Sequence, residues 1–173
     1  GFRPGLSAEE LLEIIGDYDG LAIRSATKVT PEVLAKATKL RAVGRAGIGV
    51  DNVDVPAATK AGVVVMNTPF GNSVTTAEHA ITMMLSLTRQ IPQAHMSTIA
   101  GKWEKSKFLG TEISGKRLGL IGCGNIGAIV ADRAQGLKMR VMGFDPFLTP
   151  ERAKQLGIEK VELDELLAKA DFI

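Results

Sequence analysis

The chain has 173 residues, of which 45% are hydrophobic and 23% charged, a composition typical of a folded globular protein and not of a disordered one. Lysine and arginine number 21 against 19 aspartates and glutamates, so the net charge of +2 gives no reason to expect a nucleic-acid surface. No apolar run reaches the roughly 20 residues of a membrane span, and the single cysteine, Cys123, excludes an internal disulfide. We therefore expect a cytoplasmic protein without a metal site or a membrane partner.

The ends of the sequence predict that the chain is an internal piece of a longer protein. It begins at Gly1 with no methionine, and it stops at Ile173 within what reads as the opening of a strand. The last residues contain no cap, turn or polar tail.

The first part of the chain predicts alternating helices and strands. Helices are expected over residues 8–15, 31–39 and 56–60, and strands over residues 20–23, 40–43 and 63–66. Ser7 and Glu10 have the spacing of a capping box, while Thr30 and Asp54 are suited to cap the next two helices. The last strand is entirely apolar, so we expect it to be buried on both faces of a parallel sheet. This alternation predicts an α/β fold.

The pattern changes after residue 67. A long helix is expected over residues 73–90, because Ala77, Ile81 and Met84 recur at helical spacing. Ile91-Pro92 should end or kink it, and a second helical stretch should reach about residue 100. An irregular segment over residues 102–112 then leads into a strand over 117–121.

A glycine-rich turn carries the clearest chemical signal. The strand at 117–121 leads into Gly122-x-Gly124-x-x-Gly127, a helix is expected over 128–137, and Asp145 follows the next strand, 140–144. In a dinucleotide-binding turn the first glycine permits the bend, the second lets a diphosphate approach, and the third lets helix and strand pack closely. The amides of Asn125 and Ile126 would then line the diphosphate.

The acid after the second strand indicates which dinucleotide is bound. Asp145 could accept hydrogen bonds from the hydroxyls of a ribose, and its charge would repel a 2′-phosphate, so NAD is favoured over NADP. The alternative is a purely structural turn in which Asp145 caps a local bend. We expect Cys123, within the turn, to be a packing residue without a redox role, because it has no resolving partner.

Further stretches at residues 24–30, 44–54, 67–73 and 101–104, together with this turn, resemble the D-isomer-specific 2-hydroxyacid dehydrogenase family over nearly the whole chain. The chain is most similar to the branch that oxidises D-3-phosphoglycerate to 3-phosphohydroxypyruvate with NAD, the first step of serine biosynthesis. The resemblance implies two Rossmann/flavodoxin-like parallel-sheet domains, both incomplete here. These would be a partial substrate-binding domain at 1–67 and the first half of a dinucleotide-binding domain at 73–173.

The resemblance also implies a homo-oligomer, a dimer or tetramer, whose contact region runs from the long helix to Arg117. Trp103 would lie in that contact, or else be a buried aromatic anchor of one subunit. Arg45 and Lys105 would add positive charge near a substrate phosphate, or else be solvated surface residues.

Residues of the first part would bind the substrate. The resemblance implies that Arg24, Ser25 and Asn52 contact it, and that Gly47 and Gly49 belong to a loop whose amides bind its carboxylate. Ile48, where some members carry threonine, would lie beside the nicotinamide. The alternatives are a surface ion pair for Arg24 and a turn residue for Asn52.

The catalytic residues themselves are expected elsewhere. The family uses a histidine oriented by an acid, plus an arginine, and these would lie beyond Ile173. His79 and His95 lack the matching context and should be structural or surface residues. We therefore expect this chain alone to be inactive. Two other functions remain open: oxidation of another D-2-hydroxy acid such as glycerate or lactate, and a dinucleotide-sensing module like some transcriptional corepressors.

Overall fold

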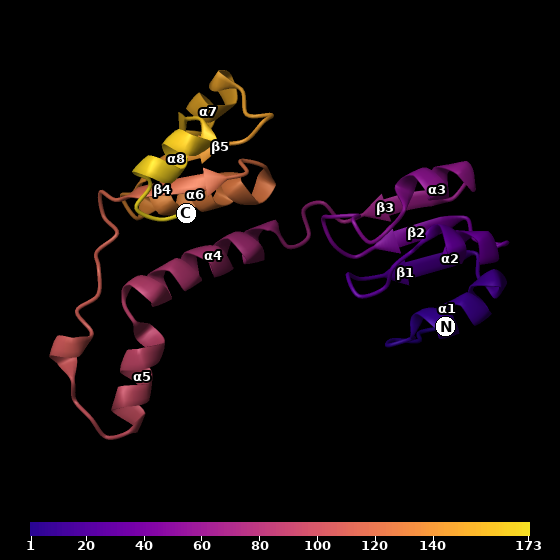
Figure 1. The fold of residues 1–173 in the computed structure, drawn as a ribbon, viewed down its shortest axis with the longest axis horizontal. Coiled ribbons are helices and arrows are strands. Elements are labelled where there is room, and N and C mark those ends of the chain that lie inside the picture. The colour runs from indigo at the N-terminus through magenta and orange to yellow at the C-terminus, as the bar shows by residue number, and fades with distance from the viewer. The chain divides into compact units, whose positions relative to one another are not determined.

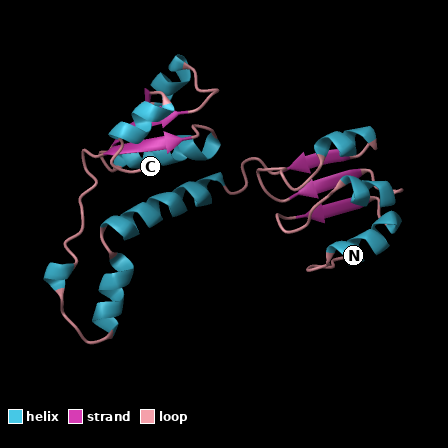
Figure 2. Ribbon diagram, in the orientation of Figure 1, coloured by secondary structure: helices cyan, strands magenta, loops and turns pink.

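A computed structural model describes all of the residues, Gly1–Ile173. The chain divides into two compact units, Gly1–Asn72 and Ser73–Ile173. Each unit contains its own three-stranded sheet, in which every pair of neighbouring strands is parallel (Figures 1 and 2). The α/β class predicted from the sequence is therefore confirmed.

The first unit alternates helices with short strands. Its elements are α1 (Ala8–Ile14), β1 (Gly20–Ile23), α2 (Pro31–Lys36), β2 (Ala42–Arg45), α3 (Val55–Lys60) and β3 (Val64–Asn67), with a 3₁₀ turn at Ile15–Asp17. The strands lie in the order β1-β2-β3. The predicted caps form: Ser7 and Glu10 make a reciprocal capping box, and Thr30 and Asp54 each accept an amide hydrogen bond in the first turn of their helices.

Some boundaries in this unit differ from the prediction. Helix α2 ends at Lys36, because Ala37 has a non-helical ψ of 60°, whereas a helix to about Lys39 was expected. Strand β2 begins at Ala42 and not at Leu40, since its register is set by the neighbouring strand, where Gly20 pairs with Ala42. The start of a strand depends on a pairing partner that is distant in sequence, and the local pattern does not contain it.

The expectation that β3 is buried on both faces is wrong in this structure. Val64 and Met66 are 59% and 53% exposed, whereas Val43 in the central strand is fully buried. The sequential strand order with right-handed connections places α2 and α3 on the same face of the sheet. The core of this unit lies under those helices, and the opposite face leaves Val64 and Met66 open.

The second unit begins with two helices and continues with alternating strands and helices. Its elements are α4 (Ser73–Thr88), α5 (Ile91–Ile99), a 3₁₀ turn at Lys105–Lys107, β4 (Arg117–Ile121), α6 (Asn125–Gly136), β5 (Arg140–Phe144), α7 (Pro150–Leu156), β6 (Glu159–Lys160) and α8 (Leu163–Lys169). Gln90, in the left-handed region at φ 52°, separates α4 from α5. The sequence analysis made no prediction for α7, β6 or α8, although Thr149-Pro150 and Gly157 are ordinary start and stop signals.

Helix α6 is the centre of packing in the second unit. Helix α4 lies along it through the predicted apolar residues, with Ala77 fully buried and Ile81 and Met84 partly buried in the same cluster.

None of the helices combines the length and the apolar composition that crossing a membrane requires.

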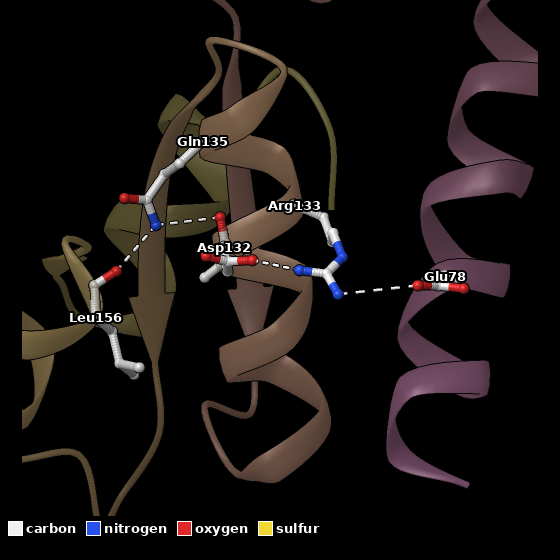
Figure 3. Close-up of polar contacts among 6 residues, drawn as sticks. Glu78, Asp132, Arg133, Gln135 and Leu156 are labelled. Atoms are coloured by element: carbon white, nitrogen blue, oxygen red, sulfur yellow. Dashed lines mark hydrogen bonds and ion pairs between the residues drawn. The ribbon is translucent and has the colours of Figure 1, made fainter.

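Polar contacts add to this packing (Figure 3). The Arg133 guanidinium on α6 pairs with Asp132 and lies 3.8 Å from a Glu78 carboxylate oxygen on α4. The Gln135 side-chain amide donates to the carbonyls of Ala131 at 3.1 Å and Leu156 at 2.9 Å, so it links α6 to the end of α7. Helix α6 is thereby tied to its neighbours on two sides.

Candidate functional site

The turn between β4 and α6 uses each of its three glycines for a different reason. Gly122 has φ +100°, which side chains rarely adopt. A Cβ on Gly124 would meet nothing within 4 Å, so open space lies beside this residue. A Cβ on Gly127 would lie 2.2 Å from the Gly122 carbonyl oxygen, so only glycine lets α6 approach the turn this closely. The bend at Gly122 and the close packing at Gly127 are as the spacing predicted, whereas diphosphate binding at Gly124 stays a prediction.

Helix α6 begins directly at this turn, three residues earlier than expected. Its N-cap is Gly124, no side chain caps it, and the first intrahelical bond is donated by Ala128 to the Gly124 carbonyl at 2.9 Å. The amides of Asn125 and Ile126 therefore precede the helical hydrogen-bond ladder. Unpaired amides at the positive end of a 12-residue helix favour an anion such as a diphosphate.

Asp145 is fixed to this turn by its own hydrogen bonds. One carboxylate oxygen accepts the Cys123 amide at 2.9 Å and the other accepts the Phe147 amide at 2.8 Å. These bonds hold the pKa of Asp145 below its ordinary value, so the carboxylate is ionised. Each oxygen keeps lone pairs for a further donor. The structural role given as the alternative for Asp145 is therefore real, and it leaves capacity for ribose hydroxyls.

Cys123 points into the core of the second unit. It is 7% exposed, and its sulfur lies 2.7 Å from where a Cβ on Gly143 would stand. Burial raises the pKa of its thiol, and the negative charge of Asp145 raises it further. The thiol is packed and protonated, which agrees with the packing role expected for it.

The strand order places this turn at a change of direction in the sheet. Strands β4, β5 and β6 are neighbours in that order, and Phe172 pairs with Leu118 on β4 in a parallel bridge. Because β5 and Phe172 both pair with β4, the chain leaves β4 toward one side and returns on the other. Open α/β sheets bind ligands at such a point, beyond the carboxyl ends of the strands.

In the first unit, the strand ends bring three polar residues, Arg24, Arg45 and Asn67, to one edge of the sheet. Ile23, Arg45 and Asn67 are paired across β1, β2 and β3, and Arg24 follows directly after Ile23. Arg24 is exposed and forms no ion pair, so the surface-pair alternative is not observed. Ser25 is exposed beside it. The edge therefore presents an uncompensated guanidinium.

Arg45 lies against the glycine loop that follows β2. A Cβ on Gly47 would stand 2.1 Å from one terminal nitrogen of the guanidinium, so the absence of a side chain there makes room for it. The Arg45 Nε is buried and has no hydrogen-bond partner. A positive charge with an unpaired donor thus lies on the loop that the family resemblance assigns to substrate binding.

Asn52 connects the two loops of this edge. Its side-chain amide donates to the carbonyls of Arg24 at 2.9 Å and Thr27 at 2.7 Å. Its own carbonyl accepts the Val29 amide at 2.8 Å. Both amide hydrogens are therefore used within the chain, as the turn alternative requires, and Asn52 holds the backbone that carries Arg24.

The remaining candidates are spread over both units. Ile48 is half-buried in the glycine loop, whereas His79 and His95 are exposed on α4 and α5, and Lys105 is exposed in the 3₁₀ turn. Trp103 is 85% exposed, so its reading as a buried anchor of one subunit is wrong. The apolar character of an aromatic residue gives no information about which surface covers it.

A contact from Asn67 was not predicted. Its side-chain amide donates to the carbonyl of Ile48 at 2.7 Å, although the sequence placed Asn67 only within a family motif. The signal that could have found it is its position at the carboxyl end of a strand neighbouring the glycine loop.

Comparison with known proteins decides the family. A sequence profile described as D-isomer specific 2-hydroxyacid dehydrogenase, catalytic domain, matches residues 2–163. The chain belongs to this family. It is 48% identical over 171 residues to a D-3-phosphoglycerate dehydrogenase of Synechocystis, covering 99% of this chain and 31% of the relative. A human protein of the same name is 50% identical over 171 residues, at 99% and 32% coverage. The chain thus spans about a third of the length of these relatives.

Solved structures agree with this membership. The TT0316 protein of Thermus thermophilus superposes with a TM-score of 0.87 at 30% identity, over 99% of this chain and 53% of that one. A D-lactate dehydrogenase of Aquifex aeolicus complexed with NAD and lactic acid has a TM-score of 0.85 at 26% identity, over 92% of this chain and 48% of that one. An acyclic imino acid reductase in complex with NADPH and D-Arg has a TM-score of 0.85 at 28% identity, over 96% of this chain and 53% of that one. The family fold therefore occurs with either nicotinamide coenzyme.

Proposed function

We propose that the protein carrying this chain is an NAD-dependent dehydrogenase that oxidises D-3-phosphoglycerate to 3-phosphohydroxypyruvate, which would place it in serine biosynthesis. The observation that carries the proposal is the identity of 48% and 50%, over nearly the whole chain, to relatives that bear the name of this enzyme. The open anion-binding turn of the second unit and the unpaired guanidinium groups of the first support it.

The second unit, which begins at Ser73, would be the dinucleotide-binding domain. Gly122, Gly124 and Gly127 would admit the diphosphate of NAD to the amides of Asn125 and Ile126, and Asp145 would accept the ribose hydroxyls. When bound, NAD supplies a nicotinamide ring that accepts a hydride from the substrate carbon. The ionised Asp145 favours NAD, since it would repel the extra phosphate of NADP.

The first unit would be the substrate-binding domain. The guanidinium groups of Arg24 and Arg45 suit an anionic substrate with both a carboxylate and a phosphate. The loop that contains Gly47 and Gly49 would contact the carboxylate, and Ile48 would pack on the nicotinamide without the hydroxyl contact that threonine provides. Asn52 would contribute by holding the Arg24 loop.

We propose a second copy of the chain as the protein partner. Large apolar side chains on α4, α5 and the segment that follows are more than half exposed: Met83, Leu87, Ile91, Met96, Ile99, Trp103 and Leu109. Apolar surface gathered on consecutive elements is typical of an interface between subunits. Homo-oligomerisation would cover this apolar surface and bury the Trp103 side chain.

A substrate panel tests the proposed reaction. The protein expressed from the complete reading frame around this sequence should reduce NAD with D-3-phosphoglycerate, and its kcat/KM should exceed the values for D-glycerate and D-lactate by at least about tenfold. Exchange of the exposed Arg24 for glutamine (Arg24→Gln) should raise KM for phosphoglycerate about tenfold, by loss of a charged hydrogen bond, and leave KM for glycerate nearly unchanged.

Two other results would change the conclusion. Equal rates with glycerate or lactate would assign another D-2-hydroxy acid as the substrate. Tight binding of NADH without oxidation of any acid would favour a dinucleotide-sensing module. The 173-residue chain by itself should show no oxidation, because the catalytic base is expected beyond Ile173.

A further inference from the structure

Two hydrogen bonds from the end of β3 hold consecutive carbonyls of the glycine loop. The Asn67 side-chain amide donates to the Ile48 carbonyl at 2.7 Å. The backbone amide of the next residue, Thr68, donates to the Gly47 carbonyl at 3.0 Å. Both donors come from one short segment, so the two carbonyls are drawn toward the same side of the loop.

Peptide geometry then fixes the direction of the amides. All peptide bonds of the chain are trans, and in a trans peptide the C=O of one residue and the N–H of the next point in opposite directions. Since the carbonyls of Gly47 and Ile48 face the end of β3, the amides of Ile48 and Gly49 face away from it. Neither amide donates a hydrogen bond within the chain.

We propose that Asn67 is a positioning residue for substrate binding: by holding the Ile48 carbonyl, it turns the amide of Gly49 outward, beside that of Ile48, to bind the carboxylate of the substrate. This inference rests on the proposed function and names the device behind one of its contacts. Adjacent outward amides make an anion-binding concavity, and amides fixed before binding lose little freedom when the anion arrives.

Charged side chains of both signs lie against the loop. The Arg45 guanidinium lies over Gly47, where a Cβ would stand 2.1 Å from it. Asp51 supplies the opposite charge: its carboxylate oxygen lies 2.8 Å from where a Cβ on Gly49 would stand. A side chain at Gly49 would therefore collide with Asp51, and a misplaced anion would be repelled by it. Because these two charges have opposite signs, the affinity for a carboxylate depends on how closely Asn67 fixes the direction of the loop amides.

Asn67 acts through another residue and would not touch the substrate. One of its two side-chain N–H groups donates to the Ile48 carbonyl, and the residue stands at the end of β3 with its side chain exposed. Because the side chain is exposed, its removal should leave the fold of the first unit intact. The effect of a substitution should appear in the affinity for a carboxylate and in nothing else.

The test compares two ligands that differ in the carboxylate. The protein from the complete reading frame would be prepared as wild type, Asn67→Ala and Asn67→Asp, with Thr59→Ala as the matched control. The Thr59 hydroxyl also donates to a backbone carbonyl, that of Val55 on α3 at 2.9 Å, but outside the loop. Binding of D-3-phosphoglycerate, of glycerol 3-phosphate, which lacks the carboxylate, and of NADH would be measured by calorimetry.

We expect Asn67→Ala to lower the affinity for D-3-phosphoglycerate about tenfold, which is the effect of one hydrogen bond. The affinities for glycerol 3-phosphate and for NADH should stay within about twofold of the wild-type values. Asn67→Asp should lower the affinity for D-3-phosphoglycerate more, because a carboxylate facing the Ile48 carbonyl would repel it and turn the peptide. KM for phosphoglycerate should rise in both variants with little change in kcat, and Thr59→Ala should match wild type.

Unchanged phosphoglycerate affinity in Asn67→Ala, or equal losses for both phosphate ligands, would overturn the inference while the proposed function stood. Wild-type protein that binds NADH but neither phosphoglycerate nor another 2-hydroxy acid would overturn the proposed function, and this inference with it.

Discussion

The two units both present backbone amides beyond the end of a parallel strand, but they do so by different means. In the second unit, α6 supplies the amides and its dipole, and three glycines shape the turn before it. In the first unit no helix follows β2 directly, and the loop at Gly47–Gly49 is oriented by hydrogen bonds to its carbonyls from Asn67 and Thr68. We infer that the site in the second unit would depend on backbone shape, and that the site in the first unit would depend on a side chain as well.

This difference predicts how each site fails. A helix N-terminus needs only space and a bend, so it is sensitive to any added Cβ and insensitive to the identity of most side chains. A loop held by a side-chain amide tolerates changes of volume at its exposed positions but depends on the donor. Substitutions in and around the turn of the second unit test the first of these two dependences.

The largest effect is expected from a methyl group in the turn. The exchange Gly127→Ala would put a Cβ 2.2 Å from the Gly122 carbonyl oxygen, so α6 must move away from the turn. We expect a loss of about 1–3 kcal/mol in the free energy of unfolding and a fall of about a hundredfold in NADH affinity, measured by urea denaturation and fluorescence titration.

The matched control for that variant lies at the other end of the same helix. A Cβ on Gly136 would meet nothing within 4 Å, so Gly136→Ala should raise the free energy of unfolding by up to about 1 kcal/mol and leave NADH binding unchanged. Equal behaviour of the two alanine variants would refute the role of close packing at Gly127.

A smaller effect is expected at Asp145. The exchange Asp145→Asn removes the charge that accepts the Cys123 and Phe147 amides, so NADH affinity should fall about tenfold while NADPH affinity falls less or rises. Asp132→Asn, on the exposed side of α6, is the control and should change neither affinity. A fall of equal size for both coenzymes would argue against repulsion of the 2′-phosphate.

The pH dependence of the wild type follows from the same contacts. The Cys123 and Phe147 amides lower the pKa of Asp145. The contribution of the ionised carboxylate to NADH affinity is therefore present above the ordinary aspartate pKa, and it is lost only as the pH falls through the lowered value. NADH titrations between about pH 5 and pH 8 should therefore show no step from this carboxylate. A transition in that range that disappears in Asp145→Asn would contradict the assignment.

The smallest effects are expected at the contacts around α6. Gln135→Ala removes two bonds to carbonyls and should cost about 1 kcal/mol in urea denaturation. Glu78→Gln should cost less than about 0.5 kcal/mol, since Glu78 and Arg133 are both roughly half exposed. Neither should alter NADH affinity. A reversed order would mean that the ion pair, and not the side-chain amide, secures the neighbours of α6.

Much of the fold was predictable because its signals are local. Ser7 with Glu10, Thr30 and Asp54 are caps that act within one helical turn, and strands β1, β4 and β5 begin and end where the pattern predicts. Two of the errors depend on long-range structure. The start of β2 depends on its register with β1, and the exposure of Val64 and Met66 depends on which face the helices cover.

The same distinction applies to the candidate sites. The glycine turn could be predicted because its residues are adjacent in sequence and each has a backbone reason. The bonds of Asn52 and Asn67 join residues 19 to 28 positions apart, and a side-chain amide gives no sign in sequence of which carbonyl it will meet.

The packing of Cys123 against Gly143 couples a position in the turn after β4 with a position in strand β5. The sulfur fills the volume that a side chain at 143 would need, with Ile158 closing the same space at 2.9 Å. Sequence drift at these sites should therefore be conditional: residue 143 becomes free to enlarge only after residue 123 has shrunk. An engineer who wishes to replace the thiol with a larger side chain has to find that volume elsewhere, because the neighbouring strand offers none.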